Sequence, residues 1–136
     1  MGVMLDISCI GDSIATYQGL GSALHCSEIH AKIGVPSSYI IDEARVSGPH
    51  DICVISAGSN DPLNLNLKQN LETIRNNVKC NIVVWILPAN LRASNIVKNV
   101  ASEYHDKVAQ VIHGHDGVHP RSYTELANEV KSTLTR

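Results

Sequence analysis

Short apolar runs alternate with longer segments of helical periodicity along most of the chain. Three of these runs are almost continuously apolar, which is typical of strands buried on both faces of a parallel sheet. A fourth segment alternates apolar and polar residues, and a fifth has a weaker apolar pattern. In chain order, we expect strands at 4–10, 28–33, 51–57, 81–87 and 107–112.

The segments between these runs carry apolar residues at helical spacing. The clearest stripe starts after Ser122, which forms a capping box with Glu125 and so marks the first turn of a helix. Amphipathic stripes predict three helices, at 67–78, 97–104 and 123–134. Shorter helices are expected at 17–25 and 37–46.

Strands that alternate with helices indicate a parallel sheet covered by helices on both faces. We therefore predict an α/β protein with a three-layer α/β/α flavodoxin-like sandwich and a five-stranded parallel sheet of order 2-1-3-4-5. The length of 136 residues and the lack of repeats or linkers predict a single domain over 1–136.

Composition excludes several classes of function. The net charge is −2 with acids and bases interspersed, so we expect no nucleic-acid partner. No apolar run approaches the length of a membrane span, and Met1–Asp6 lacks the basic leader of a signal peptide, so we expect a cytoplasmic protein with no membrane partner. The cysteines lie far apart in the sequence, so all four (Cys9, Cys26, Cys53 and Cys80) are expected to be reduced.

Three polar clusters follow the predicted strands. Gly11-Asp12-Ser13 follows the first strand, Gly58-Ser59-Asn60-Asp61 the third, and Asp116-Gly117-Val118-His119 the fifth. Because the carboxyl ends of parallel strands share one edge of the sheet, the clusters are expected to face the same ligand-binding edge. Each cluster alone also has the composition of an ordinary turn, in which Asp12 or Ser13 could cap a following helix.

Together, the clusters contain the parts of a serine hydrolase. A serine hydroxyl needs an adjacent base, and His119 could accept the proton of Ser13 while Asp116 holds the imidazole in the required tautomer. A developing oxyanion needs donors already in place, which the Asn60 amide, the Ser13 N–H and a glycine N–H from a neighbouring loop could supply.

These clusters resemble the motifs of the SGNH hydrolases, also called GDSL-type esterases. The matches run in order over about 110 residues. The resemblance implies Ser13 as nucleophile, Asp116 and His119 as its triad partners, and Ser13, Gly34 and Asn60 as oxyanion donors. Gly34 corresponds to a motif of a single glycine, and Ser37 or Ser38 nearby could serve instead. Ile14 replaces the leucine that often follows the serine in this family.

The resemblance implies a serine esterase that acts through an acyl-enzyme, with no cofactor and no metal. The short connection at 88–95 leaves little material for a lid, which favours an open site and small acyl groups such as acetyl, with a carbohydrate ester as one candidate substrate. A lysophospholipase or thioesterase of the same type is an alternative, as is a non-catalytic flavodoxin-like binding module. His113 and His115 lie close to Asp116 in the sequence, and these residue types also suggest a metal site, but their spacing matches no zinc pattern. No pattern in the chain fixes an oligomeric state.

Overall fold

A computed structural model describes residues 5–136 and places five parallel strands in one sheet of order β2-β1-β3-β4-β5. The strands are β1 (Ile7–Gly11), β2 (Glu28–Ala31), β3 (His50–Ser56), β4 (Cys80–Ile86) and β5 (Lys107–Ala109). This order confirms the predicted α/β flavodoxin-like fold. Residues 1–4 lie outside the described residues. They include the first residue of the strand expected at 4–10 and most of Met1–Asp6, the segment for which no signal peptide was expected.

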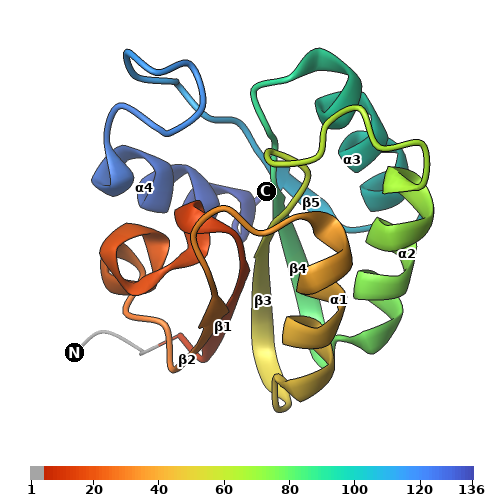
Figure 1. Cartoon of the computed structure of the whole chain (residues 1–136). Coiled ribbons are helices and arrows are strands. Elements are labelled where there is room, and N and C mark those ends of the chain that lie inside the picture. Colours follow the sequence, from red (N-terminus) through yellow and green to blue (C-terminus); the bar gives the residue numbers. More distant parts are fainter. Residues whose placement is uncertain (1–4) are drawn as a thin grey trace.

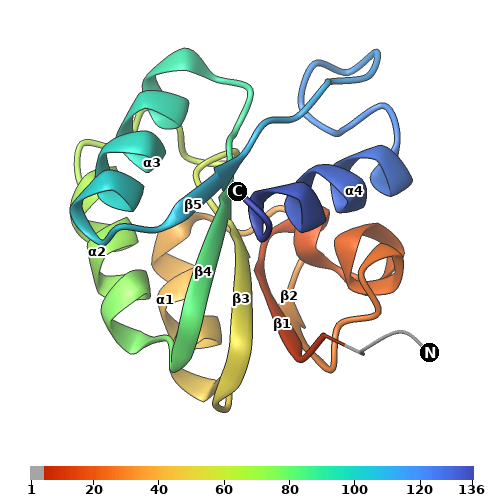
Figure 2. The ribbon, with the colours of Figure 1, turned by 180° about the vertical axis from the view of Figure 1, so that it is seen from behind.

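Helices cover both faces of the sheet and give the molecule three layers (Figures 1 and 2). One face carries α1 (Ser37–Val46), α2 (Leu67–Asn77) and α3 (Leu91–Glu103). The other face carries α4 (Tyr123–Thr133) together with the 3-10 turn η1 (Ser13–Ala15) and the π-helical turn η2 (Tyr17–Gly21). Within residues 5–136, none of these helices has both the length and the apolar character needed to cross a membrane.

The strands bury side chains on both faces, which explains their almost continuous apolar runs. In β4, Val83 and Trp85 join the core beneath α1, α2 and α3, whereas Val84 and Ile86 join the core beneath α4. All four side chains are buried. The stripes predicted for the three longer helices supply the opposite walls of these two cores, so the pattern of the sequence determines which face of each helix is buried.

Several boundaries differ from the prediction. The second strand ends at Ala31 rather than residue 33, and the fifth ends at Ala109 rather than residue 112. The helix expected at 17–25 is a π-helical turn interrupted by non-helical backbone at Gly19. Ser122 caps α4 as predicted by accepting a hydrogen bond from Glu125 N, but the Glu125 carboxylate pairs with Arg121 instead of completing the capping box.

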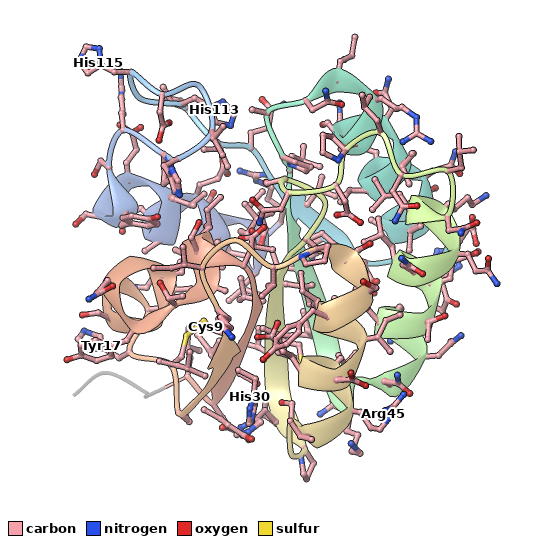
Figure 3. All side chains as sticks on the ribbon, in the orientation of Figure 1. Cys9, Tyr17, His30, Arg45, His113 and His115 are labelled. Carbon is pink, nitrogen blue, oxygen red and sulfur yellow. A yellow bond between two sulfur atoms is a disulfide. The ribbon has the colours of Figure 1, made fainter. Side chains whose placement is uncertain are left out.

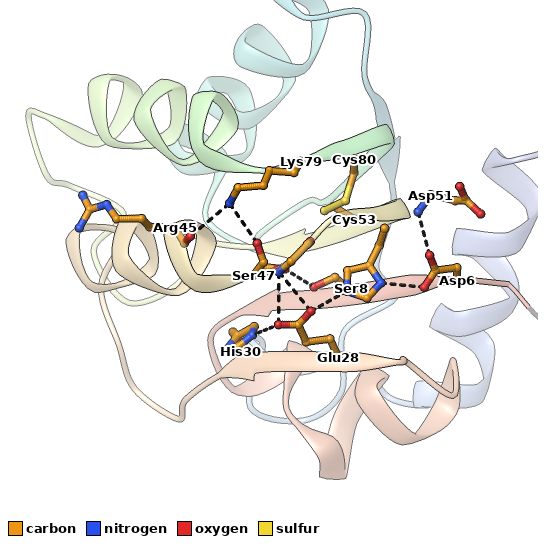
Figure 4. Close-up of polar contacts among 12 residues, drawn as sticks. Asp6, Ser8, Glu28, His30, Arg45, Ser47, Asp51, Cys53, Lys79 and Cys80 are labelled. Carbon is orange, nitrogen blue, oxygen red and sulfur yellow. Dashed lines mark hydrogen bonds and ion pairs between the residues drawn. A yellow bond between two sulfur atoms is a disulfide. The ribbon is translucent and has the colours of Figure 1, made fainter.

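The four cysteines form two disulfides, so the expectation that they are reduced is wrong. Cys9 in β1 pairs with Cys26, which lies just before β2, and Cys53 in β3 pairs with Cys80 at the start of β4 (Figures 3 and 4). The partners are 17 and 27 residues apart in sequence, yet the neighbouring strands bring their Cα atoms to 6.1 and 5.8 Å. Those separations suit a disulfide. Pairing of neighbouring strands, rather than cysteine spacing, therefore decides which sulfurs meet.

Candidate active site

The three polar clusters lie at one edge of the sheet, as the sequence predicted. Parallel pairing places Gly11 at the end of β1 beside Ser56 at the end of β3, so the first two clusters begin side by side. The loop that carries the third cluster connects β5 to α4 and lies above the same edge, at the top of Figure 1. This is the carboxyl edge, where open α/β sheets bind their ligands.

Gly11 allows β1 and β3 to approach closely just below Ser13. A Cβ atom at Gly11 would lie 1.9 Å from the carbonyl oxygen of Ser56, so only glycine fits this position. The next residue, Asp12, donates its backbone N–H to Ser56 O over 3.1 Å and accepts the Ile14 N–H on Oδ1 over 3.2 Å. Asp12 thus caps η1, one of the two caps considered from the sequence, and sets Ser13 at the first position of the turn.

The structure brings Ser13, His119 and Asp116 into one hydrogen-bonded chain. Ser13 Oγ lies 2.7 Å from His119 Nε2, although the two residues are 106 positions apart in sequence. On the other side of the ring, His119 Nδ1 lies 2.6 Å from Asp116 Oδ2. This is the order of contacts that a nucleophile, its base and an orienting carboxylate require.

Asp116 is held in its ionised form by the loop around it. Its Oδ1 accepts the backbone N–H groups of Val118 and His119, each over 2.8 Å. The Val118 N–H, the His119 ring and the His119 N–H together lower the pKa of the Asp116 carboxyl below its usual range. A carboxylate can only accept, so His119 donates its Nδ1–H to Asp116, and Nε2 is left as the acceptor for the Ser13 hydroxyl.

A hairpin-like loop fixes the position of His119. Gly114 N donates to His119 O over 2.9 Å, Arg121 N donates to Ile112 O over 2.9 Å, and His113 pairs with Pro120 in an antiparallel bridge. The side chains of His119 and Asp116 nevertheless remain 43% and 53% exposed. The hydrogen-bonded chain is therefore ordered by its own loop and is open to solvent.

The other two histidines of this loop do not gather into a metal centre. Figure 3 shows His115 at the outer tip of the loop and His113 farther back along it. In residues 5–136, no group of three or more His, Cys, Asp or Glu side chains is arranged to hold a metal ion.

Asn60 is tied to the loop that contains Gly34. Its Nδ2 donates to Val35 O over 3.0 Å, which is its one side-chain hydrogen bond within residues 5–136, so Asn60 does not bond Ser13 directly. An amide carries a second N–H, which stays free to donate to a substrate oxygen. Gly34 has a φ of +79°, a backbone conformation that favours glycine, and among the described residues no atom beyond Gly34 and its two chain neighbours lies within 4 Å of the position of its missing Cβ.

Ser37 has another role than oxyanion donation. It is buried, and both its N–H and its Oγ–H donate to the Asp61 carboxylate, over 3.1 and 2.5 Å. Ser38, the other alternative to Gly34, is exposed in the first turn of α1. Sequence reasoning missed the capping of α1 by Asp61, because the two residues lie 24 positions apart. Ser37 thus orders the start of α1 beside the Gly34 loop.

Asp12 is a second functional candidate whose environment the sequence did not reveal. Its side chain is 1% exposed, and its Oδ1 accepts the Ser56 hydroxyl over 2.7 Å. Burial raises the pKa of Asp12 to about 6, against the opposing hydrogen bonds from Ser56 and Ile14 and the charge of His119. The Gly-Asp-Ser order signals a turn, but only the tertiary structure shows a buried carboxyl next to Ser13.

A hollow of about 320 Å³ is lined in part by Gly117 and Val118, the two residues between Asp116 and His119 in the chain. Its walls come from the loops that follow β3 and β4 and from the loop that carries His119; they are Ser59, Pro62, Ala89, Asn90, Gly117 and Val118. Because α3 begins at Leu91, the connection after β4 is even shorter than the expected 88–95 and forms only one side of the hollow.

Comparisons with protein-family models, with curated proteins and with solved structures found no match to this chain. The geometry of the site therefore carries the functional argument.

Proposed function

We propose that the protein is a serine esterase of the SGNH type that hydrolyses small acyl esters, with Ser13 as nucleophile, His119 as general base and acid, and Asp116 as the carboxylate that orients His119. The observation that carries this proposal is the continuous chain from Ser13 Oγ through both nitrogens of His119 to Asp116. A serine turn with a structural role alone would not need an imidazole at 2.7 Å whose other nitrogen is held by an ionised carboxylate.

The reaction proceeds in two steps. Ser13 Oγ attacks the acyl carbon as its proton moves to His119 Nε2, and the carbonyl oxygen becomes an oxyanion. The Ser13 N–H, the second Asn60 amide hydrogen and the Gly34 N–H are the proposed donors to that oxyanion. The bond to the alcohol oxygen then breaks, and the alcohol leaves with the proton from Nε2. A water molecule next transfers a proton to Nε2 and attacks the acyl carbon, which releases the acid and restores the Ser13 hydroxyl.

The surroundings of the site favour a short acyl group. The adjoining hollow of about 320 Å³ mixes polar walls, such as Ser59 and Asn90, with small apolar ones, such as Ala89 and Val118. His119 and Asp116 are open to solvent, so a bulky polar alcohol, including a carbohydrate, could extend away from the protein. A long acyl chain would remain largely in water, which disfavours a lysophospholipase and leaves a thioesterase for short acyl groups as the second candidate.

The direct test is hydrolysis of p-nitrophenyl acetate by the full chain and by Ser13→Ala. We expect the variant to lose at least about 10³-fold in kcat/KM. Ser102→Ala, which removes an exposed hydroxyl on α3, is the matched control and should keep the wild-type rate. Equal rates for wild type and Ser13→Ala would remove Ser13 as the nucleophile.

The acyl preference is tested with p-nitrophenyl esters from acetyl to decanoyl and with acetyl and decanoyl thioesters. We expect kcat/KM to fall as the chain lengthens. A preference for decanoyl would overturn the small-acyl proposal while keeping the esterase. No hydrolysis of any of these substrates would favour a non-catalytic binding module.

A further inference from the structure

A groove of about 540 Å³ lies between strand β2 and helix α1, at the edge of the sheet. β2 is the outermost strand, and within residues 5–136 no strand pairs with its outer side. One wall comes from β2 and from Lys32, the residue that follows it (His30, in this wall, is labelled in Figure 3). The other wall is a single stripe of α1, whose members recur at helical spacing: Tyr39, Asp42, Glu43 and Val46. The volume is within the range of about 300–1,000 Å³ that is usual for small-molecule sites.

The helical wall contains a buried hydrogen-bonding group that no group of the described chain satisfies. Glu43 is 8% exposed, and its Oε1 atom is covered and has no hydrogen-bond partner within residues 5–136. Most buried polar atoms of folded proteins do have a partner, because burial without one is costly. The neighbouring Asp42 is exposed and accepts a hydrogen bond from Arg45 over 2.7 Å. Glu43 therefore brings an unused carboxyl to the wall of the groove.

The Glu43 carboxyl is mostly uncharged at neutral pH. Burial is the largest cause that raises its pKa, to about 8; the charge of Asp12 raises the pKa further, and Lys32 opposes both effects. A protonated carboxyl donates through its O–H and accepts on its other oxygen. An ammonium or guanidinium ligand gains little from an uncharged carboxyl, so a neutral ligand with both donors and acceptors fits Glu43 better.

The rest of the groove combines apolar surface with an aromatic ring and a cation. Tyr39 is 43% exposed, and the Lys32 ammonium lies 5.5 Å from the centre of its ring, so the two walls meet at this contact. Ile29, Ala31 and Val46 supply the apolar surface. Lys32 can only donate hydrogen bonds and so needs an acceptor from the ligand. A ligand for this groove therefore needs an apolar side and polar groups that both donate and accept.

We propose that the groove between β2 and α1 binds a carbohydrate unit, with Glu43 hydrogen-bonded to its hydroxyl groups and Tyr39 against the C–H side of the ring. A sugar hydroxyl both donates and accepts, so neighbouring hydroxyls can satisfy the Glu43 carboxyl and the Lys32 ammonium together. The C–H groups of the ring form the apolar side that the aromatic and aliphatic walls require. This site binds its ligand without a reaction, so it goes beyond the proposed esterase and does not depend on it.

The groove reaches the edge of the sheet at which the loops of the candidate active site begin. Lys32 donates its backbone N–H over 3.0 Å to the carbonyl oxygen of Gly11, which lies two residues before Ser13. Gly34, a proposed oxyanion donor, follows Lys32 by two residues. A carbohydrate in the groove therefore lies beside the segment that connects β2 to the candidate site.

The site is tested by binding, without hydrolysis. The probes are the methyl glycosides of glucose, galactose, mannose and xylose, none of which carries an ester, added to the ¹⁵N-labelled full chain in an NMR titration. At least one should shift the backbone amide signals of β2 and α1, with a dissociation constant on the order of 1 mM. Butylammonium is the cationic comparison and should not shift them. If no glycoside shifts these signals, or if butylammonium shifts them instead, the carbohydrate proposal is wrong.

Substitutions at Glu43 test its role in binding. Glu43→Leu keeps a side chain of similar size that suits burial but removes the carboxyl, so it should weaken glycoside binding by about tenfold or more while the circular dichroism spectrum stays that of the folded protein. Glu43→Gln keeps an uncharged donor and acceptor and should bind within about threefold of the wild type. Unchanged affinity in Glu43→Leu, or an equal loss in Glu43→Gln and Glu43→Leu, would overturn the role of Glu43.

The aromatic wall provides a second test that does not depend on Glu43→Leu folding. Tyr39→Ala should weaken glycoside binding by about tenfold, because it removes the ring against which the sugar packs. Tyr17→Ala, which removes another exposed tyrosine from η2, is the matched control and should keep the wild-type affinity. Equal affinities for Tyr39→Ala and Tyr17→Ala would place the carbohydrate outside this groove. None of these measurements involves hydrolysis, so failure of the esterase proposal in the Ser13→Ala experiment would leave them unaffected.

Discussion

Ser13 Oγ and His119 Nε2 lie 2.7 Å apart, and a separate set of hydrogen bonds holds each of the two residues. Asp12 caps the turn that carries Ser13, and Asp116 holds both the backbone and the ring of His119. The turn of Ser13 and the loop of His119 are thus each ordered by a carboxylate of their own.

Asp116→Asn should reduce activity by changing the tautomer of His119. The oxygen of the new side-chain amide can still accept the N–H groups of Val118 and His119, so the loop should keep its shape. The amide nitrogen would then face Nδ1 and donate to it, which moves the ring proton to Nε2 and removes the acceptor for Ser13. We expect kcat/KM for acetyl ester hydrolysis to fall by about 10²–10⁴-fold.

The control for this substitution is a measurement that the variant is still folded. The circular dichroism spectrum and the thermal unfolding midpoint of Asp116→Asn should stay close to those of the wild type. Activity within threefold of the wild type, in a folded variant, would show that Asp116 does not set the tautomer.

Asn60→Ala should lower kcat far more than it changes KM. The hydrogen bond from Nδ2 to Val35 O orients the amide, and its second N–H is the proposed donor to the oxyanion, which exists only during the reaction. We expect a loss of about 10²–10³-fold in kcat. Asn64→Ala, which removes an amide bonded to Asp61 in the same loop, is the matched comparison. A loss of less than threefold for Asn60→Ala would remove the residue from this role.

The sheet order could be predicted because burial on two faces leaves a strong signal in the sequence. β3 and β4 carry continuous apolar runs, and the polar clusters after β1, β3 and β5 mark the edge at which the strands end. The end of β2 was less clear because Lys32 and Ile33 continue its alternating pattern after the strand has ended, although Lys32 N still bonds Gly11 O. Strand existence is thus encoded locally, whereas strand ends depend on neighbours.

The chemistry of buried groups could not be predicted in the same way. The burial of Asp12, the pairing of Asp61 with Ser37 and both disulfides depend on contacts between residues 17 or more positions apart, which no local pattern records. The hydrogen bonds among Ser13, His119 and Asp116 also join residues that are distant in sequence, but here a three-part motif specified which serine, histidine and aspartate to compare. The motif therefore predicted which side chains meet, and their catalytic roles stay a prediction.

Ser56→Ala should destabilise the protein through Asp12. Loss of the Ser56 hydroxyl removes one of the two hydrogen bonds to Asp12 Oδ1 and leaves a buried carboxyl with only the Ile14 N–H. We expect the free energy of unfolding near pH 8 to fall by about 1–3 kcal/mol, measured by urea denaturation. Because the Ser56 bond lowers the pKa of Asp12, the variant should also raise that pKa in an NMR titration. Ser94→Ala on α3, which removes a buried hydroxyl not bonded to Asp12, should leave the Asp12 titration unchanged.

His50 should make the stability of the fold depend on pH at the edge of the sheet opposite to the site. Its Nδ1 lies 2.7 Å from Asp6 Oδ1 and its Nε2 lies 2.5 Å from Glu28 Oε1, so both nitrogens must donate and the ring is positively charged. The two carboxylates, of Asp6 and Glu28, are labelled in Figure 4. These bonds raise the pKa of His50, while His50 and then His30 lower the pKa of Glu28 to about 2. Lys79, which also lies near this cluster, donates to backbone oxygens of Arg45 and Ser47.

The signs of the two shifts define a pH window. The His50 contribution is fully present below the unfolded pKa of about 6.5 and is lost as the pH rises through the higher folded pKa. The Glu28 contribution is present above its unfolded pKa of 4.5 and is lost as the pH falls toward about 2. Glu28→Gln should therefore destabilise the protein most between about pH 4.5 and 6.5 and less near pH 9, as measured by thermal unfolding. Asp42→Asn breaks an exposed ion pair with Arg45 and is the control. It should change the thermal unfolding midpoint by the same small amount near pH 5.5 and near pH 9. An equal loss for Glu28→Gln near pH 5.5 and pH 9 would show that Glu28 stabilises the strands by packing rather than by its charge.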